Sequence, residues 1–195
     1  EMSLPIIYSV HRVNTIKLSF AEERLWFIDN LESGTNAYNI SMVVKLATTT
    51  KLEYMLQAIT AVVSRHEILH SIVCEDKDAN VYREVLQIDC IDFIHTQIYD
   101  NRESLNAKLK EAVNHVFKLD QDIPIRVTAY EPIDANSDTV LLILMHHIAS
   151  DGWSMEVFVK EINTLYQYYS KLEANPGIPF PLAELTIQYK DYALW

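Results

Sequence analysis

The segment TVLLILMHHIASDGWS, residues 139–154, decides the fold of this chain. It opens with an uninterrupted apolar run, continues with the adjacent pair His146 and His147, and then reaches Asp151 and Gly152. A short apolar run of this kind predicts a buried strand. Because successive strand residues point to opposite faces, the two histidines point in opposite directions if the strand continues through them. At most one imidazole can therefore face a given cleft, and the other becomes a hydrogen-bonded group of the core.

Periodic patterns on both sides of this segment extend it into one layered unit. Apolar residues recurring every three or four positions predict helices, at residues 19–31, 51–67, 104–117, 152–172 and 187–195. Alternating or continuous apolar runs predict strands, at residues 38–46, 69–75, 81–87, 91–96, 125–130 and 139–146. Ser19 followed by Glu22 has the spacing of a helix capping box. Interspersed helices and strands predict an α/β (α+β) two-layer sandwich with a mixed sheet and packed helices.

Composition excludes several classes of partner. The chain has 195 residues and a net charge of −11, with acidic residues scattered throughout, so neither nucleic acid nor an anionic membrane is expected as a partner. No apolar run is long enough to span a bilayer, and the first residues lack the order of a secretory signal. We therefore expect a cytoplasmic protein. Cys74 and Cys90 each lie in a predicted strand without metal-type spacing, and we expect two buried thiols.

A metal site is not predicted at the histidine pair. His146, His147 and Asp151 are close in sequence, but adjacent strand histidines do not converge on one ion. Asp151 begins a predicted helix, where unpaired N–H groups and the positive helix end stabilise a carboxylate. Gly152 permits a backbone conformation or a close approach that larger residues deny. Helix capping explains the aspartate alone, but not the two histidines before it.

The segment at 146–152 matches the HHxxxDG motif of the condensation domains of nonribosomal peptide synthetases. Three further segments resemble the first, second and fourth motifs of that family, in the same order: SFAEERLW at 19–26, RHEILHS at 65–71 and YKDYALW at 189–195. Three residues depart from the usual patterns: Glu22 replaces Gln, His70 replaces Arg and Ser71 replaces Thr. Together the four motifs cover the whole chain.

This resemblance implies a particular architecture. Such domains have two lobes, each similar to chloramphenicol acetyltransferase, with the active site in a tunnel between them. By this resemblance residues 1–173 are the N-terminal lobe of a condensation domain. Residues 174–195 are then a proline-rich crossover and short helix leading to a C-terminal lobe beyond the chain. The lobe face that would meet that partner is expected to be apolar.

The resemblance also implies an amide-forming, acyltransferase-type enzyme that makes secondary metabolites. Donor and acceptor carrier domains would deliver aminoacyl or peptidyl thioesters on phosphopantetheine arms, beside a neighbouring adenylation domain, and the lobe would bind no cofactor directly. His147 matches the catalytic histidine, and His146 is implied to be structural. Asp151 is implied to pair with an arginine, for which Arg65 is the candidate, and Gly152 to line the cleft. The lobe alone is expected to be inactive.

Three alternatives remain open. Epimerisation domains share the same framework, but Trp153 and Ser154 after the Asp-Gly pair resemble the subclass that condenses L-configured donors. Non-catalytic relatives that only recruit a partner protein typically lose the second histidine, whereas His147 is present. An acyltransferase that uses coenzyme A is compatible with the histidine and aspartate alone.

Overall fold

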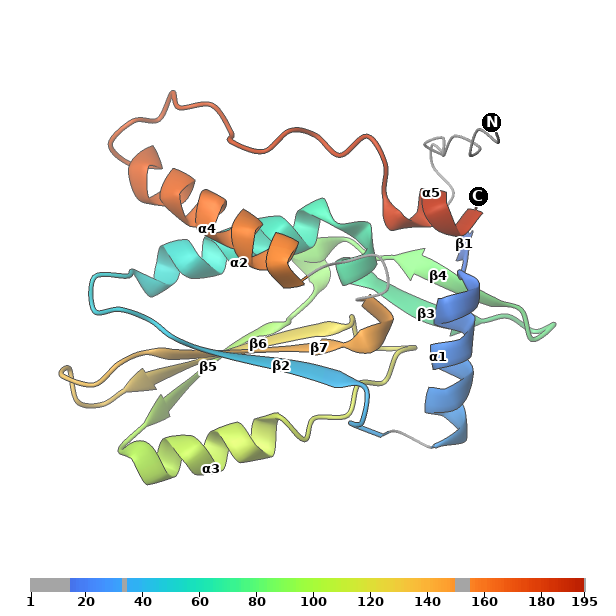
Figure 1. Cartoon of the computed structure of the whole chain (residues 1–195), viewed down its shortest axis with the longest axis horizontal. Coiled ribbons are helices and arrows are strands. Elements are labelled where there is room, and N and C mark those ends of the chain that lie inside the picture. The colour runs from blue at the N-terminus through green and yellow to red at the C-terminus, as the bar shows by residue number, and fades with distance from the viewer. Residues whose placement is uncertain (1–14, 33–34, 150–154, 195) are drawn as a thin grey trace, which may run out of the picture.

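The computed structural model describes residues 15–32, 35–149 and 155–194, and it consists of two sheets with helices packed around them (Figure 1). The helices are α1 Phe20–Leu31, α2 Leu52–Arg65, α3 Arg102–Ala112, α4 Met155–Leu172 and α5 Tyr189–Leu194, with short 3-10 turns η1 Glu67–His70, η2 Ile88–Cys90 and η3 His147–Ala149. The strands are β1 Thr15–Lys17, β2 Asn39–Lys45, β3 Ser71–Glu75, β4 Val81–Val85, β5 Ile94–Tyr99, β6 Ile125–Pro132 and β7 Val140–His146. The mixed α+β fold class is confirmed.

β7 is a central strand of the larger sheet. The strand order of this sheet is β2-β7-β6-β5, in which β7 is antiparallel to both neighbours and β5 is parallel to β6. Every residue of β7 is buried, as expected for a strand that is covered on both faces. In this register Asn39 of β2 lies opposite His146, so β2 begins where β7 ends.

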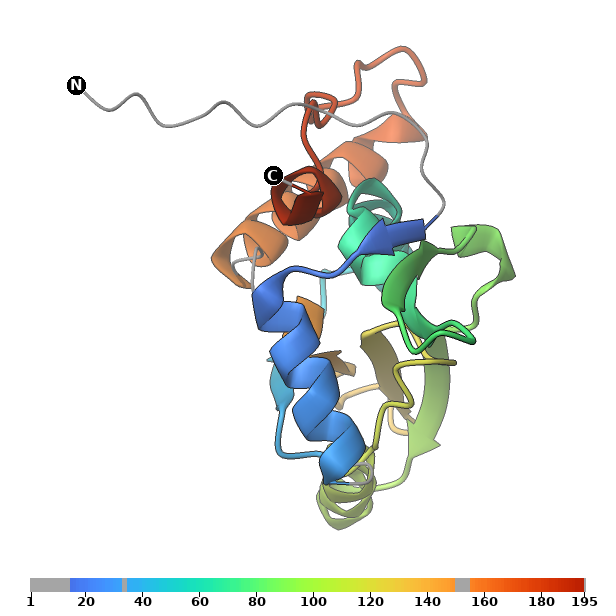
Figure 2. The same cartoon turned by 90° about the vertical axis from the view of Figure 1, so that its right-hand side faces the viewer.

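Helices cover both faces of this sheet (Figures 1 and 2). Leu141, Ile143 and Met145 belong to the main core, which also contains the inner faces of α2 and α4. On the other face, Val140 and Leu142 pack with α3. The predicted alternation along the strand is therefore confirmed.

The smaller sheet has the order β1-β4-β3 and is entirely antiparallel. β3 and β4 form a hairpin in the region where two short strands are predicted. Its turn is stabilised by Asp76, whose carboxylate accepts hydrogen bonds from the backbone N–H groups of Asp78 and Asn80. β1 lies outside the predicted strands, and it joins α1 to this sheet through its pairing with β4.

Two predicted boundaries and one predicted environment are wrong. The helix predicted at 104–117 ends at Ala112, because buried Phe117 belongs to a separate cluster with Leu119 and Leu144. The strand predicted at 91–96 is Ile94–Tyr99 instead. The two thiols predicted to be buried are not: Cys90 lies exposed in η2 rather than in a strand, and Cys74 of β3 is half-buried.

The last segment returns across the helices (Figure 1). After α4 the chain passes without regular structure to α5, which lies beside β1 and η1. Gln188 holds this end in place, because its amide donates to the carbonyl oxygen of Arg65 at 3.0 Å and accepts from the N–H of Glu67 at 3.3 Å. Within the described part of the chain, no helix is both long and apolar enough to cross a membrane.

Candidate functional site

The two adjacent histidines have opposite environments. β7 ends at His146, which is 1% exposed, whereas His147 begins η3 and is exposed. The N–H of His147 donates to the carbonyl oxygen of Tyr38 at 2.8 Å, which fixes the backbone at the point where the strand ends. The imidazole of His147 can therefore meet a reactant from solvent, whereas that of His146 cannot.

The side chain of His146 is surrounded by other residues of the chain. Its Nδ1 accepts a hydrogen bond from the N–H of Ile148 at 3.0 Å, and its Nε2 lies 3.6 Å from Oδ1 of Asp29. The rings of Phe117 and Tyr38 lie 6.2 and 6.4 Å away between centroids. Burial, and then the charge of His147, lower the pKa of His146 to about 4. The ring is therefore neutral at physiological pH.

Arg65 ends α2 and contacts a carboxylate that the sequence did not single out. Its Nε lies 3.3 Å from Oε1 of Glu161 on α4, and Oε2 of the same carboxylate lies 2.7 Å from Nε2 of His66. Burial lowers the pKa of His66, although the hydrogen bond to Glu161 opposes that shift. The sequence did contain a signal for a buried partner at Glu161, because this charged residue lies on the apolar face of its helix between Phe158 and Leu165. Asp151 and Gly152 lie outside the described residues.

The N-terminal end of α1 buries a second cluster. Ser19 and Glu22 form the predicted capping box, in which Ser19 N–H donates to Glu22 Oε2 at 2.7 Å. Glu22 also forms an ion pair with Arg83 of β4, and both side chains are buried. Arg83 lies over the ring of Tyr189, 5.5 Å from its centroid, and burial lowers the pKa of Arg83 to about 10. Glutamate at position 22 therefore has a cation as its partner.

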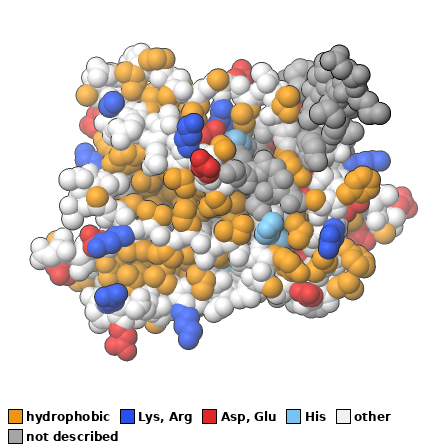
Figure 3. All heavy atoms as spheres, in the orientation of Figure 1, with side chains coloured by type: hydrophobic (Ala, Val, Ile, Leu, Met, Phe, Trp, Pro, Cys, Tyr) orange, Lys and Arg blue, Asp and Glu red, His pale blue; other side chains and the backbone are white. Residues whose placement is uncertain are grey.

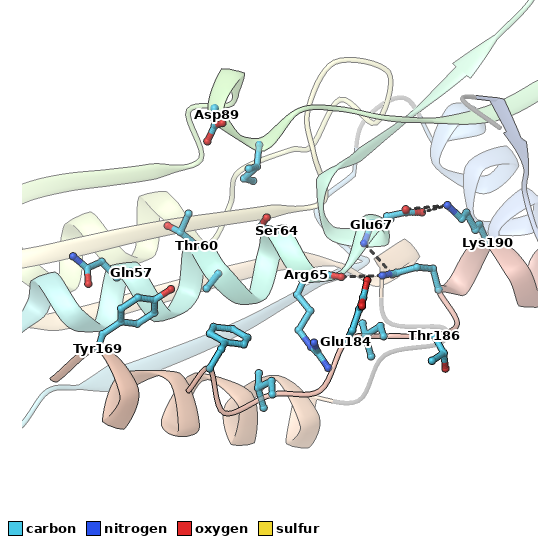
Figure 4. A pocket seen from close by; sticks show the side chains of 16 residues that line it. Gln57, Thr60, Ser64, Arg65, Glu67, Asp89, Tyr169, Glu184, Thr186 and Lys190 are labelled. Carbon is cyan, nitrogen blue, oxygen red and sulfur yellow. Dashed lines mark hydrogen bonds and ion pairs between the residues drawn. The ribbon is translucent and has the colours of Figure 1, made fainter. Parts of the chain in front are cut away.

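A groove of about 1250 Å³ lies between α2, η2 and the segment before α5, and Figure 4 shows its lining. Arg65, Glu67 and Lys190 border one end, where Lys190 Nζ lies 2.8 Å from Oε2 of Glu67. Neither His146 nor His147 lines this groove. The groove is therefore separate from the site that the histidine pair defines.

The central strand β7 thus leads into one buried and one exposed histidine, and the long helix α4 follows a few residues later in the sequence. The family model of the condensation domain matches residues 13–195, so the chain belongs to the condensation domain family. The membership predicted from the four motifs is confirmed.

Curated relatives place this family in large synthetases. The chain is 32% identical over 191 residues to a probable non-canonical nonribosomal peptide synthetase of Salinispora arenicola, covering 98% of the chain and 2% of that protein. It is also 32% identical over 197 residues to a dimodular nonribosomal peptide synthase of Bacillus subtilis, covering 100% of the chain and 8% of that protein. The chain thus spans a small fraction of these relatives.

Solved structures agree with this fold. The X-domain in a complex with OxyB from teicoplanin biosynthesis is 25% identical, with a TM-score of 0.81 that covers 100% of this chain and 40% of that one. The starter condensation domain of rhizomide synthetase is 14% identical, with a TM-score of 0.70 over 82% of this chain and 38% of that one. The second likeness supports the fold alone.

Proposed function

We propose that this chain is part of a condensation domain that forms an amide bond between two carrier-bound thioesters, with His147 acting on the attacking amine. The observation that carries the proposal is the contrast between the two histidines: His146 is buried and neutral, while His147 is exposed where the central strand ends. Membership of the condensation domain family supports this class of reaction.

In the proposed reaction, the acceptor amine attacks the carbonyl carbon of the donor thioester. A C–N bond forms, the C–S bond breaks, the thiol of the donor phosphopantetheine leaves, and the amine loses a proton. A neutral imidazole at position 147 can accept that proton or hold the amine in line. The phosphopantetheine arms belong to donor and acceptor carrier domains, and a neighbouring adenylation domain would supply the activated amino acids.

Four residues are proposed to support His147. His146 is proposed to fix the turn that carries His147, because its Nδ1 accepts a hydrogen bond from the N–H of Ile148. Asp151 is proposed to pair with Arg65, and Gly152 to line the cleft. Glu161 contacts the Nε of Arg65, and a guanidinium has further N–H donors with which a second carboxylate can pair.

We also propose that residues 1–173 form an N-terminal lobe and that residues 174–195 lead to a C-terminal lobe. The chain covers about 40% of the solved relatives, which supports this proposal. Apolar side chains gather along β2 and between β2 and α4 (Figure 3). In β2 itself, Val43 is 53% exposed. Without a second wall, water is not excluded and the thioesters are not held in line, so the chain alone is expected to be inactive.

The test uses the full-length protein supplied with ATP and a pool of the twenty proteinogenic amino acids, with amide products measured by mass spectrometry. His147→Ala is expected to abolish most amide formation and to keep the fold by circular dichroism. A matched control is His115→Ala, which removes an imidazole from the segment after α3. Near-normal product from a folded His147→Ala variant would refute the catalytic assignment.

A second candidate function is recruitment of a partner protein without catalysis. The likeness to the X-domain over the whole chain favours it, whereas the presence of His147 favours catalysis. The same experiment separates the two candidates. A recruitment module would form no amide in the wild type, and its His147→Ala variant would be indistinguishable from it.

A further inference from the structure

The C-terminal end of α1 places a buried carboxylate against the buried histidine. Asp29 is 7% exposed and lies in the last turn of α1, which packs against η3. Figure 1 shows α1 on the side of the molecule at which β7 ends. Oδ1 of Asp29 and Nε2 of His146 lie 3.6 Å apart; both are buried, and among the described residues neither atom has a hydrogen-bond partner.

The hydrogen bond on the other side of the ring fixes its tautomer. The backbone N–H of Ile148 can only donate, so Nδ1 of His146 must present its lone pair. The proton of the neutral ring then lies on Nε2, the atom that faces Asp29. The opposite tautomer would place two N–H groups against each other at the turn. Asp29 therefore has to accept, and a carboxylate does so.

We propose that Asp29 is a positioning residue: it holds the Nε2–H tautomer of His146, and so gives Ile148 the acceptor that shapes the turn carrying His147. The separation of 3.6 Å exceeds a normal hydrogen bond, and the proposal requires the pair to close by a few tenths of an ångström. The N–H of His147 is meanwhile held by Tyr38. The turn is thus fixed at two consecutive amides, one by backbone and one by the His146 ring.

The activity part of this inference rests on the proposed function, so the experiment includes a measurement that does not depend on it. In the full-length protein, amide hydrogen exchange of the peptide containing Ile148 is followed by mass spectrometry, together with amide product from the amino-acid pool. Asp29→Leu is expected to raise exchange at this peptide. It should also lower turnover by about tenfold to a hundredfold, the cost of a misplaced catalytic group. The KM for the carriers should not change, because Asp29 does not reach them.

Conservative variants separate positioning from packing. Asp29→Asn keeps an acceptor oxygen and should stay within about threefold of the wild type in both measurements, since only the charge is lost. His146→Asn places an amide oxygen near the Nδ1 position and should keep Ile148 protected. In that background Asp29→Leu should have no further effect. Asn30→Leu, an exposed neighbour on α1, is the matched control for added apolar surface.

Each outcome decides the proposal. Equal losses from Asp29→Leu in the wild-type and His146→Asn backgrounds would show that Asp29 acts through packing alone. If Asp29→Leu does not fold, His146→Gln, which offers a donor near Nε2 but no acceptor to Ile148, should lose protection while His146→Asn keeps it; the reverse order overturns the inference. Activity in a His147→Ala variant would refute the proposed function, and the exchange data would still decide the role of Asp29.

Discussion

The two ends of α1 each bury a carboxylate, but against different partners. At the first turn, Glu22 meets Arg83, a permanent cation that is itself buried. At the last turn, Asp29 faces His146, whose lowered pKa of about 4 leaves it neutral. A buried carboxylate with a cation is compensated by charge, whereas one beside a neutral ring can only accept a hydrogen bond. The first pair therefore contributes to holding the fold together, and the second fixes the orientation of a ring.

The largest effect is expected at Glu22. Glu22→Ala leaves Arg83 buried without its anion, which should lower the free energy of unfolding by about 3 to 5 kcal/mol. Urea unfolding of the 195-residue chain measures this change. Glu22→Gln keeps an acceptor oxygen and should cost less.

A double variant tests whether charge compensation is the cause. Glu22→Leu with Arg83→Met removes both charges, and replacing a buried pair by apolar groups is often neutral or stabilising. The double variant should therefore be more stable than Glu22→Ala. A double variant as unstable as Glu22→Ala would mean that packing, and not the charge pair, determines stability at this end of α1.

The second effect is a pH dependence that comes from His146. Its pKa falls from 6.5 in the unfolded chain to about 4 in the folded one. Between these values the unfolded state binds more protons, so stability is fully present above pH 6.5 and is lost as the pH falls toward 4. The loss should amount to roughly 3 kcal/mol. Urea unfolding at pH 7 and at pH 4.5 gives the difference in unfolding free energy between the two pH values. This difference should be smaller in His146→Asn than in the wild type, and an unchanged difference would contradict the burial of a neutral ring.

The third effect concerns Glu161, which contacts both kinds of partner at once: the cation Arg65 and the imidazole of His66. Glu161→Ala leaves two largely buried donors without this acceptor and should cost about 2 kcal/mol in unfolding free energy. Glu161→Gln keeps one acceptor oxygen and should cost about half as much. Asn163→Ala, at an exposed position on the same helix, is the control. Equal effects at positions 161 and 163 would show that α4 does not depend on this contact.

The sequence predicted what depends on local pattern. The capping box at Ser19 and the alternation along β7 follow from neighbours a few residues away, and both are confirmed. The partners that depend on tertiary packing were not predicted: Arg83 for Glu22, and Glu161 for Arg65. A charged residue at an inward position of a strand or helix signals a buried ion pair, but it does not say with which residue the pair forms. Tertiary packing also explains why the helix predicted at 104–117 was too long. Phe117 was assigned to the apolar face of that helix, but it packs in a different cluster.

The smallest effect is expected at Asp29 itself. Burial first, and then the charge of Glu32, raise the pKa of Asp29 above 3.8. The folded state therefore binds more protons than the unfolded state in the interval above pH 3.8, and stability is lost as the pH rises through the folded pKa. Asp29→Asn removes this cost and keeps an acceptor for His146, so at pH 7 it should match or exceed the wild type by less than about 1 kcal/mol.

The small stability difference between Asp29→Asn and the wild type distinguishes the C-terminal end of α1 from its N-terminal end, where a charge pair is lost in Glu22→Ala. The advantage of Asp29→Asn should shrink as the pH falls through the raised pKa of Asp29, because the wild-type carboxyl group then becomes protonated. Asp89→Asn, at an exposed position in η2, removes the same formal charge from the surface and is the control. If Asp29→Asn instead lost several kcal/mol at pH 7, Asp29 would be compensated by charge as Glu22 is. His146 would then have to be protonated in the folded chain, and Nδ1 could no longer accept from Ile148.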